Sequence, residues 1–100
     1  MSFKLSGPAD NDLFNIYVQG VLTFGQSQAE KYYAGLQDTF AFLAENPRAA
    51  AERQECRPPV RVHPHGSHVV VYRIEPWGIW IMRICHASEN WTAIDWNIDS

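Results

Sequence analysis

The chain has 100 residues, of which 46% are hydrophobic and 13% are aromatic, and its formal net charge is −3. This length supports a single small domain over residues 1–100 and leaves no room for a second core, and the composition excludes an intrinsically disordered chain. The acidic balance argues against a protein whose main task is to bind nucleic acid directly.

The N-terminus and the cysteines bear on where the protein works. Residues 1–6 are too short and too mixed for the apolar core of a signal peptide, and no stretch approaches the ~18 apolar residues of a membrane span. Cys56 and Cys85 follow no redox or zinc-binding spacing, so we expect free thiols; a disulfide would require an oxidising compartment. The sequence therefore predicts a soluble cytoplasmic protein without a cofactor, a metal or a membrane partner.

The first quarter of the chain predicts a strand and a helix. Residues 2–6 alternate in polarity, which predicts a short strand with Phe3 and Leu5 on one face. Gly7-Pro8 suits the first turn of a helix, and Gly25 is expected to end it. The expected apolar stripe of this helix consists of Leu13, Ile16, Tyr17, Val21 and Phe24.

A second helix is expected to follow at once. Ser27 and Glu30 have the spacing of a capping box, and Glu45-Asn46-Pro47 stops the helical pattern. Two antiparallel helices joined by a tight turn follow from this order. The apolar positions of the second helix are Ala29, Tyr32, Tyr33, Leu36, Phe40 and Leu43.

The rest of the chain predicts strands. Residues 48–56 are expected to be irregular or loosely helical, and Pro58-Pro59 excludes a helix there. Alternation then predicts strands over 60–65, 68–75 and 79–86, with turns at 65–67 and 76–78. The first of these strands has Val60 and Val62 on one face and Arg61, His63 and His65 on the other. An α+β domain of order β-α-α-β-β-β results, in which the helix hairpin covers one face of an antiparallel three-stranded meander.

Residues 87–100 form a tail of a different character. Asn90, Trp91, Ile94 and Trp96 are compatible with a short helix or with an arm that packs on the sheet. Docking is favoured over a free tail, because exposed tryptophans are unusual.

Charge is unevenly distributed along the chain. Residues 46–86 carry six arginines, three glutamates and all four histidines, whereas residues 87–100 carry three acidic side chains and no basic ones. Two interpretations remain open for the arginines: solvated strand faces, or a docking surface for an acidic partner. Arg73 and Arg83 lie in apolar strands, and the pattern does not fix their relative faces. The candidate docking residues in this part of the chain are Arg57, Arg61, His63, His65, Arg73, Arg83 and Trp91.

The order and spacing of several segments resemble the ParE branch of the RelE/ParE toxin superfamily, from about residue 3 to residue 91. The segments that carry the resemblance are Phe3-Lys4-Leu5-Ser6, Asp12-Leu13 with Ile16, residues 32–36, Leu43-Ala44-Glu45-Asn46-Pro47-Arg48, Arg57-Pro58-Pro59-Val60-Arg61, His63-Pro64-His65-Gly66-Ser67-His68, Val70-Val71-Tyr72-Arg73-Ile74, and Ile84 with His86.

This resemblance implies a bacterial toxin that is encoded with a ParD-type antitoxin and that poisons DNA gyrase. The RelE branch of the same fold instead cleaves mRNA on the ribosome, so the fold alone does not decide the activity. A disordered antitoxin tail that folds on binding needs an apolar groove. Candidate lining residues for such a groove are Tyr17, Val21, Tyr32 and Tyr33, although aromatic stripes on helices are more often simple core.

The residues favour a binding protein over an enzyme. RelE-like chains carry an arginine where this chain has His68 and a tyrosine where it has Trp91, so the ribonuclease constellation is incomplete. His86 is a weak catalytic candidate, because the sequence indicates neither a tyrosine nor a lysine beside it. His63 and His65 lack a third ligand at metal-binding spacing, so an exposed polar face is expected there. A decayed toxin that is retained as an antitoxin-binding repressor module is a third reading.

Overall fold

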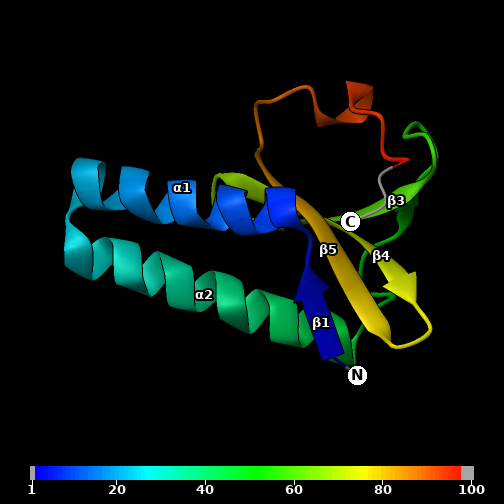
Figure 1. Ribbon diagram of the computed structural model, residues 1–100, viewed down its shortest axis with the longest axis horizontal. Coiled ribbons are helices and arrows are strands. Elements are labelled where there is room, and N and C mark those ends of the chain that lie inside the picture. Colours follow the sequence, from blue (N-terminus) through cyan, green and yellow to red (C-terminus); the bar gives the residue numbers. More distant parts are fainter. Residues whose placement is uncertain (1, 98–100) are drawn as a thin grey trace.

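The computed structural model describes residues 2–97, which form a five-stranded sheet with two long helices on one face (Figure 1). The elements are β1 (Ser2–Leu5), α1 (Gly7–Phe24), α2 (Gln26–Glu45), β2 (Glu52–Arg53), β3 (Val60–His65), β4 (His68–Glu75), β5 (Gly78–His86) and the 3₁₀ helix η1 (Trp91–Ala93). This arrangement confirms the α+β fold with an N-terminal strand, a helix hairpin and a meander.

The sheet has the order β1-β5-β4-β3-β2. Strands β3, β4 and β5 form the expected antiparallel meander, and β1 lies parallel to β5 with Ser2 opposite Gly78. Strand β2 pairs with the outer edge of β3. The expectation of irregular or loosely helical chain at 48–56 is therefore wrong at 52–53, because two residues are too few for alternation to reveal a strand.

Helix α1 is anchored to the sheet at its first turn. The Ser6 hydroxyl accepts a hydrogen bond from the Ala9 N–H at 3.0 Å, and it donates to the Met82 carbonyl on β5 at 2.7 Å. The N-cap is thereby tied to the last strand, and its removal would free one helical donor and one strand acceptor.

The connection between the helices corrects the expected capping box. Helix α2 begins at Gln26, and its N-cap is Gly25, at a φ of 91° that favours glycine. The Ser27 side chain does not cap the helix; instead, the Gln26 side-chain amide donates to Glu30 at 2.9 Å. A glycine at this position lets the chain reverse in a single residue, which puts Ser27 inside the helix.

The hairpin extends past the sheet (Figure 1). In α1 only Ala9 and Leu13 are buried, whereas the distal part of the expected apolar stripe is half-buried or exposed, and Phe24 is 73% exposed. Side chains near the tip of the hairpin therefore remain available for contact with other molecules.

Both faces of the sheet are covered. On one face, side chains of both helices, such as Leu13 of α1 and Phe40 of α2, pack against Tyr72 and Ile81 of the sheet. On the other face lies a second cluster, in which the buried Trp96 and the half-buried Trp91 and Ile94 of the C-terminal segment pack on the sheet. The part of the tail at 98–100 lies outside the described residues.

A β-bulge between β4 and β5 decides where the arginines point. The register shifts between Val71 and Tyr72, so that Val71 lies opposite Arg83 and Tyr72 opposite Ile81. Val71 belongs to the cluster on the face away from the helices, as does Trp80, on whose ring Arg73 stacks at 4.4 Å. The Arg83 side chain bonds to Asp12 of α1. Directly paired residues share a face of the sheet, so the ladder places Arg83 on the same face as Val71 and Arg73. This answers the question of relative faces that the sequence left open.

No helix among residues 2–97 is long and apolar enough to cross a membrane.

Candidate functional site

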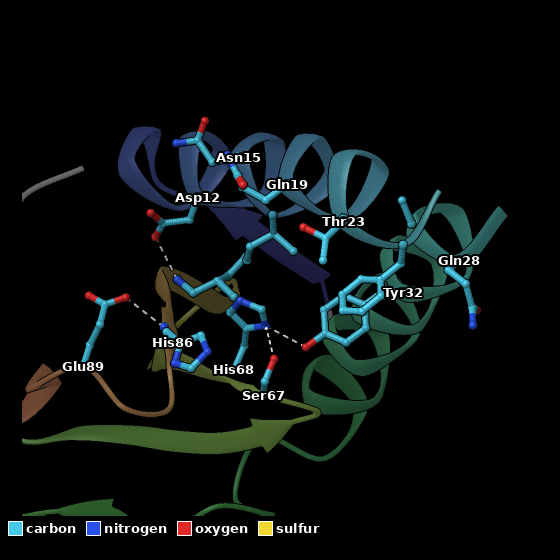
Figure 2. Close-up of a pocket in the computed structure, with 15 residues that line it drawn as sticks. Asp12, Asn15, Gln19, Thr23, Gln28, Tyr32, Ser67, His68, His86 and Glu89 are labelled. Carbon is cyan, nitrogen blue, oxygen red and sulfur yellow. Dashed lines mark hydrogen bonds between the residues drawn. The ribbon is translucent and has the colours of Figure 1, made fainter. Parts of the chain in front are cut away.

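A pocket of about 630 Å³ opens between the helix hairpin and the end of the sheet where β4 begins and β5 ends (Figure 2). It lies outside the core, along the part of the hairpin that extends past the sheet. Its lining residues are Asp12, Asn15, Ile16, Gln19, Gly20, Thr23 and Phe24 of α1, Gln28, Ala29 and Tyr32 of α2, and Ser67, His68, Ile84, His86 and Glu89 from the sheet end and its loops.

The helical wall of this pocket is largely uncharged. Small and apolar residues, among them Ile16, Gly20 and Ala29, alternate with amide and hydroxyl side chains. A Cβ atom on Gly20 would lie 3.3 Å from the Cβ of Ala29, so glycine permits the close approach of the two helices. The wall therefore offers apolar area together with side chains that both donate and accept hydrogen bonds.

Tyr32 and His68 form the inner corner of the pocket (Figure 2). The Tyr32 hydroxyl lies 2.6 Å from His68 Nδ1 and donates at 2.9 Å to the carbonyl oxygen of His65. With the phenol proton used there, His68 Nδ1 carries its own proton and donates to the phenol oxygen. Burial lowers the pKa of His68, and the nearby His86 lowers it further, so both effects favour the neutral form of the ring.

His86 stands opposite His68 at the end of β5. The two rings are 5.4 Å apart between centroids at an interplanar angle of 74°. His86 Nδ1 lies 2.7 Å from the Ser88 hydroxyl. The backbone N–H of His86 donates to the Glu89 carboxylate at 2.9 Å. The sequence indicated no tyrosine beside His86, but α2 brings Tyr32 into the same pocket.

Asp12 joins α1 to the bulged strand at the edge of this pocket. Its carboxylate accepts from Arg83 Nε at 2.6 Å and Nη2 at 2.9 Å, and from the Ile84 N–H at 3.0 Å. The Arg83 side chain is 28% exposed and the Asp12 side chain 16% exposed. The hydrogen bond to Asp12 raises the pKa of Arg83, and the guanidinium binds Asp12 through both Nε and Nη2.

The chemistry available in the pocket is proton exchange and hydrogen bonding. Two imidazoles and a phenol can pass protons, but cleavage of a phosphodiester also needs a cation for the developing charge. Arg83 is the arginine that reaches this corner, and Asp12 already neutralises it. Among residues 2–97 no group of three or more histidine, cysteine, aspartate or glutamate side chains could hold a metal ion.

The four candidate docking arginines do not form one surface. Arg61 is 14% exposed in its side chain and donates at 2.7 Å to the Ala50 carbonyl, so it braces the chain after α2. Arg73 pairs with Glu75 at 2.6 Å, and Arg83 pairs with Asp12. Arg57 is exposed. Three of these four arginines therefore bind partners within the fold.

The candidate histidines of β3 lie under α2. His65 Nδ1 is 2.9 Å from the Thr39 hydroxyl, and His63 packs near the ring of Phe42. Both are half-buried, so the expectation of an exposed polar face is wrong. The alternating pattern correctly predicts that His63 and His65 share one face of β3. It does not predict that α2 covers that face.

The remaining candidates lie in three places. Tyr17 and Tyr33 contact each other edge to face at 6.0 Å on the other side of the hairpin, where they line a second, smaller hollow. Val21 is half-buried on α1. Trp91 stacks under Arg53 at 4.9 Å within the C-terminal arm. Of the candidates, the structure brings only Tyr32 and His86 into the pocket.

Sequence reasoning did not identify the polar wall of the pocket, which consists of Asp12, Asn15, Gln19 and Thr23 on α1 with Gln28 on α2. The signal was present, because these α1 residues recur every three or four positions and therefore share one helical face. That polar face borders the apolar stripe of α1, which is the stronger periodic signal along this part of the chain.

Comparison with known proteins agrees with this architecture. The family model described as "ParE toxin of type II toxin-antitoxin system, parDE" matches residues 3–91. Toxin ParE1 of Caulobacter vibrioides is 34% identical over 88 residues, which cover 88% of this chain and 91% of the relative. A solved chain from the chromosomal ParDE toxin–antitoxin system of P. aeruginosa is 26% identical and superposes with a TM-score of 0.73, covering 86% of this chain and 95% of that one. The chain therefore belongs to the ParE toxin family of type II toxin–antitoxin systems.

Proposed function

We propose that this toxin acts in the bacterial cytoplasm by binding DNA gyrase, without catalysis of its own, and that a ParD-type antitoxin neutralises it by occupying the pocket between the hairpin and the sheet. The observation that supports this location for antitoxin binding is the pocket itself, whose helical wall consists of apolar and amide side chains. Such a surface suits an amphipathic segment that folds on binding, whose apolar side chains enter while its backbone and polar groups meet the amides.

The electrostatics of the fold support a non-catalytic mode of action. Arg61, Arg73 and Arg83 are each engaged by a carbonyl or carboxylate of the same chain. RNA cleavage would require a free cation beside the imidazoles. A toxin that acts by contact needs no such group.

The antitoxin site is tested by two matched charge insertions on α1. Phe24 lines the pocket and Leu22 does not, yet the two side chains are 73% and 75% exposed and lie in the same part of the helix. Phe24→Asp is expected to weaken the affinity for the cognate antitoxin at least tenfold, or by about 1.4 kcal/mol, in isothermal titration calorimetry. Leu22→Asp is expected to leave the affinity unchanged. Equal effects of the two substitutions would place the antitoxin elsewhere.

The gyrase target is tested by supercoiling. The purified toxin is expected to inhibit supercoiling by gyrase and to leave mRNA intact in a translation-coupled cleavage assay, and added antitoxin should restore supercoiling. Inhibition that persists with saturating antitoxin would contradict neutralisation at a shared or coupled site.

The alternative function is ribosome-dependent mRNA cleavage, and one observation favours it: Tyr32, His68 and His86 gather at one corner of the pocket. Message cleavage that is lost in His86→Ala would establish it and overturn the binding mechanism. A chain that affects neither gyrase nor message but still binds antitoxin would be a decayed toxin retained for repression.

A further inference from the structure

His68 and His86 are direct cross-strand partners in the β4–β5 ladder. The N–H of Ala87 donates to the Ser67 carbonyl at 2.8 Å, so the neighbouring His68–His86 pair is of the non-hydrogen-bonded type. In that type the two Cα atoms are closest, at ~4.5 Å, and the side chains stand side by side on one face of the sheet. The ladder thus holds two imidazoles 5.4 Å apart with no loop flexibility between them.

Each ring is also oriented through its Nδ1 atom by a hydroxyl. His68 Nδ1 lies 2.6 Å from the Tyr32 oxygen, and His86 Nδ1 lies 2.7 Å from the Ser88 oxygen. When Nδ1 donates its proton to such an oxygen, the lone pair of Nε2 is left free to act as a ligand, which is how protein groups orient metal-binding histidines. For His86 this tautomer gives up the longer 3.2 Å hydrogen bond from the Ser88 N–H.

We propose that His68 and His86 form a two-histidine site for a divalent transition-metal ion of the Zn²⁺, Ni²⁺ or Cu²⁺ class within the pocket. Imidazole nitrogen is a preferred ligand of these ions. Two protein ligands leave the other coordination positions to water, so the site is open and the ion exchangeable. The inference goes beyond the proposed function and does not depend on the identity of the antitoxin or the target.

The position of the ion has a functional side. Both ligands line the pocket, so an ion there would present its open coordination positions to whatever enters. The carboxylate of Glu89 accepts a hydrogen bond from the backbone N–H of His86, and it adds negative charge near the ion. Arg83 adds no net repulsion, because its charge is paired with Asp12.

The test is calorimetric titration of the untagged full chain with Zn²⁺. One ion per chain is expected to bind, and His86→Gln is expected to lower the affinity at least tenfold. His68→Gln should do the same. The control is His63→Gln, since His63 lies under α2 and away from the pocket, and its Zn²⁺ affinity should match that of the parent chain.

A second pair of variants separates a ligand role from a merely structural one. Tyr32→Phe removes the hydroxyl that orients His68 and is expected to weaken Zn²⁺ binding about tenfold, whereas Tyr33→Phe, on the exposed side of α2, should not. If His68→Gln fails to fold, the exposed His86 decides the matter. No saturable Zn²⁺ binding, or binding that survives His86→Gln unchanged, would overturn the site.

Discussion

Asp12 is the single residue on which several parts of the fold converge. Its carboxylate satisfies the guanidinium of Arg83 and the backbone N–H of Ile84, both next to the β-bulge. Arg83 would otherwise lie between a helix and a strand with a half-buried and unpaired charge. Loss of one partner of such a pair costs more than the pair itself contributes, because the remaining charge keeps its desolvation penalty.

Asp12→Ala is therefore expected to lower the free energy of unfolding by about 2 kcal/mol, which allows for the partial exposure of the pair. Urea denaturation followed by circular dichroism measures this loss. The matched control is Glu55→Ala, which removes the exposed Arg53–Glu55 pair, with side chains 41% and 49% exposed, and should leave the midpoint unchanged. A similar midpoint for the two variants would show that Asp12 is as dispensable as a surface carboxylate.

At the scale of elements, the junction of β1 and β5 depends on Gly78. Its φ of 154° is rarely adopted by L residues, and a Cβ there would collide with the carbonyl oxygen of Ser2 on the neighbouring strand. The clashing atoms belong to the backbone of Ser2, which cannot change its rotamer to make room as a flexible side chain can. The parallel pairing of β1 with β5 thus requires glycine at this position.

Gly78→Ala is expected to destabilise the protein by about 2–3 kcal/mol and to loosen β1. Hydrogen exchange of the β1 amides should speed up more than exchange in β4. For comparison, Gly7→Ala places a methyl group where no atom lies within 4 Å, and it should be neutral or slightly stabilising. A fully tolerated Gly78→Ala would contradict the close approach of the two strands.

Most elements of this fold could be predicted, because their signals are local. Gly7-Pro8 and Gly25 bound the first helix as expected, and alternation gave the three meander strands. Two features escaped: the two-residue strand at Glu52–Arg53 and the cap of the second helix at Gly25. The first is too short for a period, and the second depends on one backbone angle that a side-chain motif does not report.

The site was less predictable than the fold. The sequence offers His86 as a weak catalytic candidate. Its neighbours Tyr32 and His68 lie on other elements, and their approach depends on strand register and on the orientation of α2. The pairing of Arg83 with Asp12 depends on the β-bulge. Contacts of this kind are set by packing over the whole molecule, so a pattern along the chain does not contain them.

At the scale of the whole molecule, the C-terminal arm completes the second core. Trp96 is fully buried, its indole N–H donates to the Trp91 carbonyl at 3.0 Å, and its backbone N–H donates to the Arg57 carbonyl at 3.0 Å. Beneath the arm lie the free thiols of Cys56 and Cys85, and burial raises the pKa of Cys85 to about 11. The arm therefore covers one face of the sheet, and we expect burial beneath it to slow the reactions of both thiols.

Trp96→Ala is expected to cost about 3–5 kcal/mol and to expose both thiols. Their reaction with a thiol reagent at pH 8 should accelerate, because hydration returns the Cys85 pKa towards its ordinary value and raises the thiolate fraction. Trp77→Ala, which alters a tryptophan that is 41% exposed, should leave the thiol reaction rate as it is. Thiols that stay protected after Trp96→Ala would mean that the arm is not what covers them.

The parallel pairing of the first strand with the last has a consequence for synthesis. Ser2 cannot pair with Gly78 until the chain between them has been synthesised. At ~5–20 residues per second the ribosome needs roughly 4–15 s for this. Until then β1 has no strand to pair with, and the pocket lacks the lining residues Ile84 and His86 of β5. The pocket and the β1–β5 pairing are therefore completed only after β5 has been synthesised, so any partner that recognises them binds a chain whose last strand is already made.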